Sequence, residues 1–247
     1  MKIAICQPTY LPWLGYFDLL DQVDTFVLLD NVQFEKQSWQ HRNRIKTATG
    51  FQWLTVPVVF RGHFGQQIQE VEIREPEFWR KHLRALEVNY GRAPFFDEYL
   101  ACFSEGVRDH SHLVELNLTL LRRFAERLAI HTPTVLASSL KAEGKRTELL
   151  ANICSKLGAT EYLSPIGSAD YLLAEAEVLT SRGIKVEFHN FVHPEYKQLF
   201  PPFLPYACVL DLLFNEGGRS GEIIRSGRRV PLSLEQVATM VAEAPKA

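Results

Sequence analysis

Two kinds of apolar segment alternate along this chain, and the alternation constrains the fold more than any other feature. Residues 2–6 and 25–29 are short apolar runs rich in β-branched residues, whereas residues 13–22 between them place apolar side chains at helical spacing. A succession of strand, helix and strand is typical of parallel βαβ units. The sequence therefore predicts an α/β fold, a Rossmann-like doubly wound parallel sheet flanked by helices.

The same alternation continues beyond the first unit. Further strands are expected at residues 53–59, 134–137, 162–164 and 184–188. Further helices are expected at residues 77–90, 111–129, 147–157, 169–182 and 207–215, and from Ser233 onward. Because no strand separates the two central helices, they form a helical insertion. Thr147 is expected to cap its helix, and Pro57 to keep residues 53–59 at the end or edge of a sheet. Without a linker or repeat, residues 1–247 read as a single domain.

Composition narrows the class of protein. Of the 247 residues, 46% are hydrophobic and 23% charged, which is ordinary for a globular domain. The formal net charge of −2 argues against general nucleic-acid binding, so any anion site must be a local cluster. The four cysteines are far apart and are expected to be buried and reduced. With no apolar stretch near the length of a membrane span and no signal-peptide pattern, we expect a cytoplasmic protein without a membrane span.

The first candidate site is the turn that follows the first strand. Ligands of open α/β sheets bind at the carboxyl ends of strands, and helix N-termini attract anions. Two prolines and three aromatic residues make this turn rigid and flat-walled, although a stiff turn closed by core aromatics would have the same composition. The substrate-binding candidates here are Gln7, Tyr10, Trp13, Gly15 and Tyr16.

The second candidate lies between the second strand and residue 46. His41, Arg42, Arg44 and Lys46 place four potentially cationic groups within six residues, which suits a phosphate or carboxylate. The alternative is a solvated loop with surface salt bridges. The substrate-binding candidates are Gln33, Trp39, Arg42, Asn43, Arg44 and Lys46, and the acid–base candidates are Asp30 and His41.

Later turns supply further candidates. Lys145, Arg146 and Thr147 follow Gly144 at an expected helix N-terminus and could hold one phosphate, although a Walker A loop is rejected because its first glycine is missing. Ordinary capping and surface charge would explain the same residues. Ser164 and Gly167 lie in the next strand-to-helix turn, which is otherwise a tight connection. The remaining candidates are Tyr196, Gln198, Asp211 and Asn215 for binding and His189 for acid–base function.

No metal site and no cofactor are predicted. His189 and His193 are four residues apart, but Pro194 and the lack of a matching carboxylate make a helix-borne zinc site a poor explanation. A core or loop role for these histidines fits the sequence better.

Several motifs resemble the WbqC-like protein family, and they are spread over nearly the whole chain. They are Gln7-Pro-Thr-Tyr-Leu-Pro-Trp-Leu-Gly-Tyr-Phe17, Trp39-Gln-His-Arg-Asn-Arg-Ile-Lys46, Trp53-Leu-Thr-Val-Pro57, Tyr162-Leu-Ser164 and Leu210-Asp-Leu-Leu-Phe-Asn215. The resemblance implies a role in surface-polysaccharide (O-antigen) biosynthesis, with transfer of an amino acid or acyl group to a nucleotide-linked amino sugar.

The first turn also looks like the start of the HIGH-motif nucleotidyltransferases, such as the pantothenate synthetase family. Trp13-Leu-Gly-Tyr16 would occupy the position of the HxGH motif, with both histidines replaced. That likeness implies a nucleotide phosphate near Gly15, with the basic residues of 42–46 and 145–146 in place of the lost histidines.

Together these observations favour a transferase that acts on a nucleotide-activated sugar or a similar phosphorylated small molecule. Two alternatives remain open: a degenerate nucleotidyltransferase that forms an adenylate, and a non-catalytic binding or scaffold protein of a biosynthetic complex. The sequence does not distinguish a monomer from a homo-oligomer.

Overall fold

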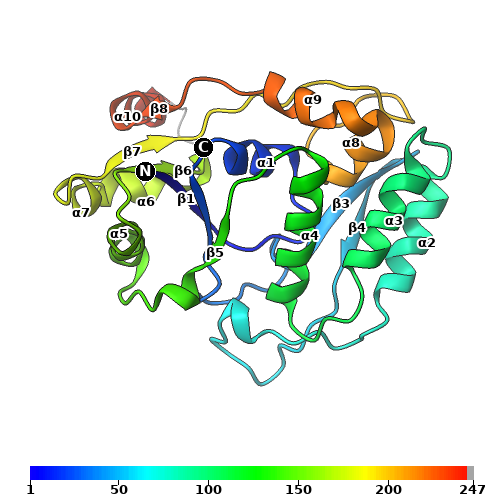
Figure 1. Cartoon of the computed structure of the whole chain (residues 1–247), viewed down its shortest axis with the longest axis horizontal. Coiled ribbons are helices and arrows are strands. Elements are labelled where there is room, and N and C mark those ends of the chain that lie inside the picture. Colours follow the sequence, from blue (N-terminus) through cyan, green and yellow to red (C-terminus); the bar gives the residue numbers. More distant parts are fainter. Residues whose placement is uncertain (244–247) are drawn as a thin grey trace.

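A six-stranded sheet forms the centre of the protein in the computed structural model, which describes residues 1–243 (Figure 1). The strand order is β5-β2-β1-β6-β7-β8. The strands are β1 (Lys2–Cys6), β2 (Thr25–Leu28), β5 (Thr134–Leu136), β6 (Glu161–Ser164), β7 (Lys185–Phe188) and β8 (Leu232–Ser233). All neighbouring pairs are parallel except β7 and β8. The predicted Rossmann-like α/β fold is confirmed.

The direction of strand succession reverses between β1 and β6. From β1 the chain adds β2 and β5 on one side, then crosses over to add β6 and β7 on the other. Gln7 follows the carboxyl end of β1, and Ser164 ends β6. Ligands of doubly wound sheets bind outside the carboxyl ends of the strands at such a reversal.

The two faces of the sheet are covered by separate sets of helices. Because side chains alternate along a strand, Ala4 and Cys6 of β1 join one buried cluster, while Ile3 and Ile5 join the other. On the first face lie α1 (Leu14–Asp21), α8 (Val209–Glu216) and α9 (Ser220–Ser226), together with the insertion described below. On the second face lie α5 (Arg146–Leu157), α6 (Ala169–Glu175), α7 (Glu177–Thr180) and α10 (Leu234–Glu243). Short 3₁₀ turns are η1 (Ile68–Glu70), η2 (Ala137–Leu140), η3 (Ile166–Ser168) and η4 (Gly217–Arg219).

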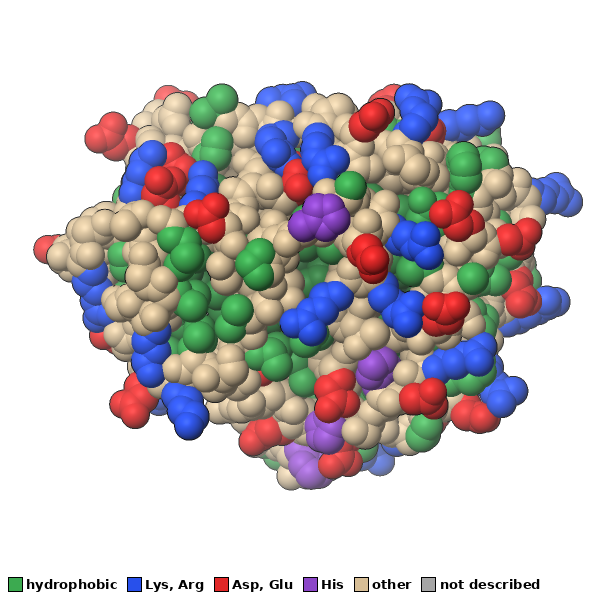
Figure 2. Space-filling view, in the orientation of Figure 1, with side chains coloured by type: hydrophobic (Ala, Val, Ile, Leu, Met, Phe, Trp, Pro, Cys, Tyr) green, Lys and Arg blue, Asp and Glu red, His purple; other side chains and the backbone are tan. Residues whose placement is uncertain are grey.

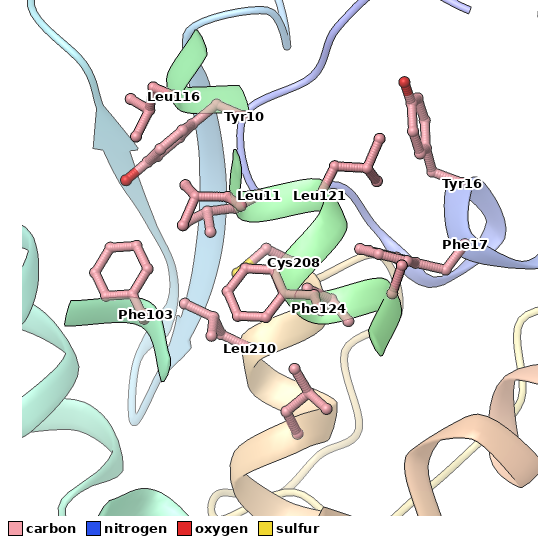
Figure 3. Packing of buried hydrophobic residues seen from close by; sticks show 14 of the residues in the cluster. Tyr10, Leu11, Tyr16, Phe17, Phe103, Leu116, Leu121, Phe124, Cys208 and Leu210 are labelled. Atoms are coloured by element: carbon pink, nitrogen blue, oxygen red, sulfur yellow. The ribbon is translucent and has the colours of Figure 1, made fainter. Parts of the chain in front are cut away.

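The insertion between β2 and β5 combines a hairpin with three helices. Its elements are β3 (Arg42–Thr47), β4 (Gly50–Thr55), α2 (Trp79–Tyr90), α3 (Phe96–Gly106) and α4 (Leu113–Arg127). Figure 1 shows the hairpin with α2 and α3 at the end of the molecule opposite α5, α6 and α7. Figure 3 shows the buried cluster in which α4 of this insertion packs near α8, with Leu11, Phe124, Cys208 and Leu210 in the core. Burial of this apolar surface holds the insertion against the sheet.

Four local predictions needed correction. Residues 42–46 belong to β3 and form no ion pair among residues 1–243, so the alternative of a solvated loop with surface salt bridges is wrong. The strand expected at residues 53–59 begins at Gly50 and ends before Pro57, paired with β3 alone. Thr147 lies inside α5, whose N-cap is Lys145. The helix expected at residues 169–182 is divided into α6 and α7.

Other local predictions are confirmed. Gly158 ends α5 with a φ of 66°, a conformation that favours glycine. Ser233 and Gln236 form the expected reciprocal capping pair. All four cysteines are buried and free. Among residues 1–243, none of the helices has the length and apolar character needed to cross a membrane. On the face seen in Figure 2, acidic and basic side chains are interspersed.

Candidate ligand-binding site

A pocket with a volume of about 260 Å³ lies beside the turn that follows β1. It is lined by Thr9, Trp13, Tyr16, Trp39, Asn43, Arg44 and Tyr206. These residues come from four segments: the β1–α1 turn with the start of α1, the loop before β3, β3 itself, and the loop before α8. The pocket therefore unites the first two sites that the sequence predicts.

Aromatic rings form the walls of this pocket. The ring centroids of Trp13 and Tyr206 are 5.4 Å apart, and Trp39 is 47% exposed. The Trp13 ring lies directly over Gly15, where an added Cβ would come within 2.2 Å of Cη2 of Trp13. Gly15 therefore contributes by making room for the Trp13 wall.

Arg44 is the cation of the pocket. Its guanidinium carbon lies 4.4 Å from the ring centroid of Phe51 and 5.3 Å from that of Trp39. Neighbouring Arg42 stacks on Trp53 at 4.3 Å. Within the described chain, no carboxylate lies within 4.0 Å of either guanidinium, and both Nε atoms are buried without a hydrogen-bond partner. Stacking on rings leaves the terminal nitrogens of an arginine available to an anion.

Two polar side chains of the pocket lining, Asn43 and Tyr16, already form hydrogen bonds with the backbone. The amide nitrogen of Asn43 donates to the backbone oxygens of Tyr10 and Leu11, and its oxygen accepts the N–H of Arg44. The Tyr16 hydroxyl donates to the carbonyl of Gln7 over 3.0 Å. Burial raises the pKa of Tyr16 well above its ordinary value, so this hydroxyl remains protonated.

A buried polar network holds the segment that ends at Tyr206. We call residues 197–206 the strap. The ammonium of Lys46 donates to Oε1 of Gln198 over 2.6 Å and to the carbonyls of Phe200 and Pro202. Burial lowers the pKa of Lys46. The side chain is nevertheless the anchor that ties β3 to the strap.

Asp211 forms the other half of this network. Its carboxylate accepts hydrogen bonds from Tyr90 over 2.8 Å, Tyr196 over 2.6 Å and Gln198 over 2.8 Å. Burial raises the pKa of Asp211, although all three donors act against this. Asn215, one turn further along α8, donates to the backbone oxygen of Asp211. These predicted binding residues thus support the strap from behind the pocket.

The three predicted acid–base residues have other contacts. The carboxylate of Asp30 accepts both the N–H and the hydroxyl of Ser138 and so caps η2. His41 bonds through both ring nitrogens to backbone groups, and burial lowers its pKa. Nε2 of His189 lies 2.7 Å from the fully buried carboxylate of Asp18. None of the three lines the pocket, and their role in catalysis stays a prediction.

The basic residues at the start of α5 lie apart from this pocket. Arg146 forms an ion pair with Glu175 at 3.1 Å, and the Thr147 hydroxyl donates to the same carboxylate. Arg146 and Tyr171 border a separate apolar depression of about 170 Å³. The structure therefore does not bring Lys145, Arg146 and Thr147 together with Arg44.

The remaining candidates are also outside the pocket. Tyr10 is fully buried, with its hydroxyl 2.8 Å from Nδ1 of His82. Gln33 forms an isolated bridge with Gln67, Ser164 is fully buried, and Gly167 faces open space.

Sequence reasoning missed two residues of the lining, Thr9 and Tyr206. Thr9 lies inside the motif that was singled out, between Pro8 and Tyr10, so its position was a usable signal. Tyr206 is the last residue of the strap, far from Trp13 in sequence, and its position depends on tertiary contacts such as those of Lys46.

The model of the WbqC-like protein family matches residues 7–223. The chain belongs to the WbqC-like family. A Mycobacterium tuberculosis (strain ATCC 25618 / H37Rv) protein described as uncharacterized is 38% identical over 231 residues, covering 92% of this chain and 99% of that protein. No solved structure matches the chain. The segment of this WbqC-like protein that the family model matches contains every residue of the pocket.

Proposed function

We propose that this WbqC-like protein binds a nucleotide-activated sugar, or a similar phosphorylated small molecule, and acts as a transferase in surface-polysaccharide biosynthesis. The observation that carries the proposal is Arg44, a cation without a carboxylate partner within the described chain, set in an aromatic pocket at the carboxyl end of β1. Family membership is consistent with polysaccharide biosynthesis.

The chemistry of the lining determines which ligand it suits. The pocket is lined by the rings of Trp13, Trp39 and Tyr206 and by a single guanidinium. Aromatic faces stack on a base or a sugar ring, and a guanidinium binds phosphate in a bidentate manner. A planar or cyclic group joined to a phosphate satisfies both requirements.

The lining also suggests which part of the reaction the pocket serves. Tyr16 is held protonated, the Asn43 amide is used by the backbone, and Arg44 is positively charged. These groups suit binding of the nucleotide-linked sugar, whose phosphate Arg44 would hold and whose amine would receive the acyl group. The base that deprotonates an acceptor amine would then come from another part of the protein or from the acceptor. Four reduced, buried cysteines agree with a cytoplasmic setting.

The test is a thermal-shift panel of ATP, CTP, UDP-sugars and dTDP-amino sugars. A ligand present at 100 times its Kd stabilises the folded state by about 2.7 kcal/mol. We expect one nucleotide class to stabilise the wild type, and Arg44→Ala to lose that shift. The matched control is Arg92→Ala, which removes an exposed arginine without a hydrogen bond or ion pair among residues 1–243.

Three outcomes would change the proposal. No shift with any panel member would favour a scaffold protein. An equal shift in wild type and Arg44→Ala would place the anion site elsewhere. Release of pyrophosphate from ATP in the presence of a carboxylic acid would instead identify an adenylate-forming nucleotidyltransferase.

A further inference from the structure

Gln7 adjoins the pocket through its backbone, and its side chain is not part of the lining. The backbone carbonyl of Gln7 accepts hydrogen bonds from Tyr16 and Thr9, both of which line the pocket. Gln7 itself is exposed and is the first residue after β1, next to the reversal between β1 and β6. This is where a doubly wound sheet receives its ligand.

The orientation of the neighbouring Gln40 amide is determined by a backbone group. Gln40 is 2% exposed, and one end of its carboxamide lies 3.0 Å from the N–H of Glu35. Since a backbone N–H can only donate, the atom that faces it must be the oxygen of Gln40. A further bond from the Asn117 amide to the Gln40 carbonyl fixes the backbone at this point.

The orientation of Gln7 follows from that of Gln40. The nitrogen of the Gln40 amide lies 2.8 Å from the Gln7 side chain. An amide nitrogen can only donate, so the atom of Gln7 that receives this bond is its oxygen. Both N–H groups of Gln7 are consequently turned outward, and no acceptor among residues 1–243 takes them.

We infer that Gln40 is a positioning residue, which fixes the Gln7 carboxamide so that its two N–H groups face the ligand at the carboxyl end of β1. The inference rests on the proposed function, since the ligand is the one bound in the pocket. It adds that this ligand carries a hydrogen-bond acceptor, such as a phosphate, carboxylate or carbonyl oxygen, beside Gln7.

Gln40→Glu tests the inference through a change of hydrogen-bond polarity. A carboxylate at position 40 still accepts the N–H of Glu35 but can no longer donate to Gln7. The Gln7 amide then turns its nitrogen toward Glu and its oxygen toward the ligand. Because a hydrogen bond to a charged acceptor is lost, the Kd for UDP should rise by about tenfold or more at pH 8.

The pH dependence separates positioning from a general structural effect. Burial raises the pKa of a carboxyl group, and a protonated carboxyl can again donate to Gln7. The UDP affinity of Gln40→Glu, divided by that of the wild type, should therefore recover as the pH falls. The control Gln37→Glu adds the same charge at an exposed position of the same loop, and its ratio should stay near one at every pH.

A measurement without ligand gives an independent answer. In ¹⁵N spectra at pH 8, the side-chain NH₂ of Gln7 should exchange rapidly with solvent in the wild type and slowly in Gln40→Glu. Unchanged exchange in the variant, or changed exchange with equal UDP affinity, would overturn the inference while leaving the proposed function intact. If neither UDP nor any other nucleotide of the panel binds to the wild type, this counts instead against the proposed function, and the exchange rates alone then decide whether Gln40 orients Gln7.

Discussion

Two clusters of basic residues stand out in the sequence, and the structure treats them in opposite ways. Arg42 and Arg44 lie on β3, stacked on aromatic rings and without a carboxylate partner among residues 1–243. Lys145 and Arg146 lie at the start of α5, where Arg146 is 68% exposed and paired with Glu175. The number of charges is similar, but their surroundings differ.

The comparison shows that the partner, rather than the charge, decides what a cation can do. An arginine that already has a carboxylate must lose it before it binds a ligand, and an exposed pair contributes little to stability. An arginine held on aromatic rings is oriented in advance and has no such competitor. The hairpin cluster is therefore the anion site that we propose, in preference to the α5 cluster.

The largest expected contrast concerns the two lysines of these regions. Lys46→Met leaves the carbonyls of Phe200 and Pro202 without this donor and removes the link between β3 and the strap. We expect a loss of about 3 kcal/mol in the free energy of unfolding, because three part-buried acceptors lose a charged donor. Lys145→Met removes an exposed lysine and should change the free energy of unfolding by no more than about 0.5 kcal/mol. Urea denaturation at pH 7 measures both, and equal losses would contradict the contrast.

Acid should weaken the hairpin region before the α5 region. Burial lowers the pKa of His82 from 6.5 to about 4, and its ring joins Tyr10 to the carbonyl of Thr55 on β4. Below pH 6.5 the unfolded chain binds a proton that the folded chain resists. The free energy of unfolding should therefore fall by about 3 kcal/mol as the pH is lowered from 6.5 to 4.

Hydrogen exchange at pH 5 provides the measurement for this acid effect. The amides of β3 and β4 should lose protection first, and His82→Gln, which keeps a donor and an acceptor, should flatten the decline. A pH dependence that persists unchanged in His82→Gln would assign the effect to another group.

Two glycines allow a smaller test. In Gly15→Ala the new Cβ meets the Trp13 ring at 2.2 Å, so the ring must leave its place in the pocket wall. We expect a loss of about 1–2 kcal/mol in stability, together with weaker nucleotide binding. Gly167→Ala, in the turn before α6, meets nothing within 4 Å and serves as the control. Thermal unfolding and tryptophan fluorescence would register the change, and identical behaviour of the two variants would disprove it.

The smallest effect is expected from Glu175→Gln. It removes the charge that faces Arg146, an exposed pair whose loss should cost about 0.5 kcal/mol or less. The freed Arg146 still lacks an aromatic platform of the kind that holds Arg44, so nucleotide affinity should not rise. A gain of affinity in a titration of this variant would mean that pairing alone separates the two clusters.

Much of the fold was predictable because the strands and helices of the sheet have clean apolar periodicities. β3 was missed because Ile45 is the one apolar residue of this strand, so the apolar alternation that predicts a strand is absent. Thr147 was assigned to the wrong helix position because a threonine before an apolar run is the usual N-cap signal.

The site was predictable only where its residues belong to one motif. Trp13 was found in the motif that follows the first strand, and Trp39 and Arg44 were found in the basic motif that follows the second. The partner of a charged residue depends on tertiary contacts. Arg146 pairs with Glu175, and His189 with Asp18, and both partners are too distant in sequence to be predicted. Tyr206 likewise reaches the pocket through contacts that join β3, the strap and α8.

The most direct test of the account is a crystal structure of the protein with the nucleotide that stabilises it best. We expect density between Trp13, Trp39 and Tyr206, with a phosphate within hydrogen-bonding distance of Arg44. A phosphate bound instead at Arg146 and the start of α5, with the aromatic pocket empty, would contradict the central claim that the unpaired arginine marks the site.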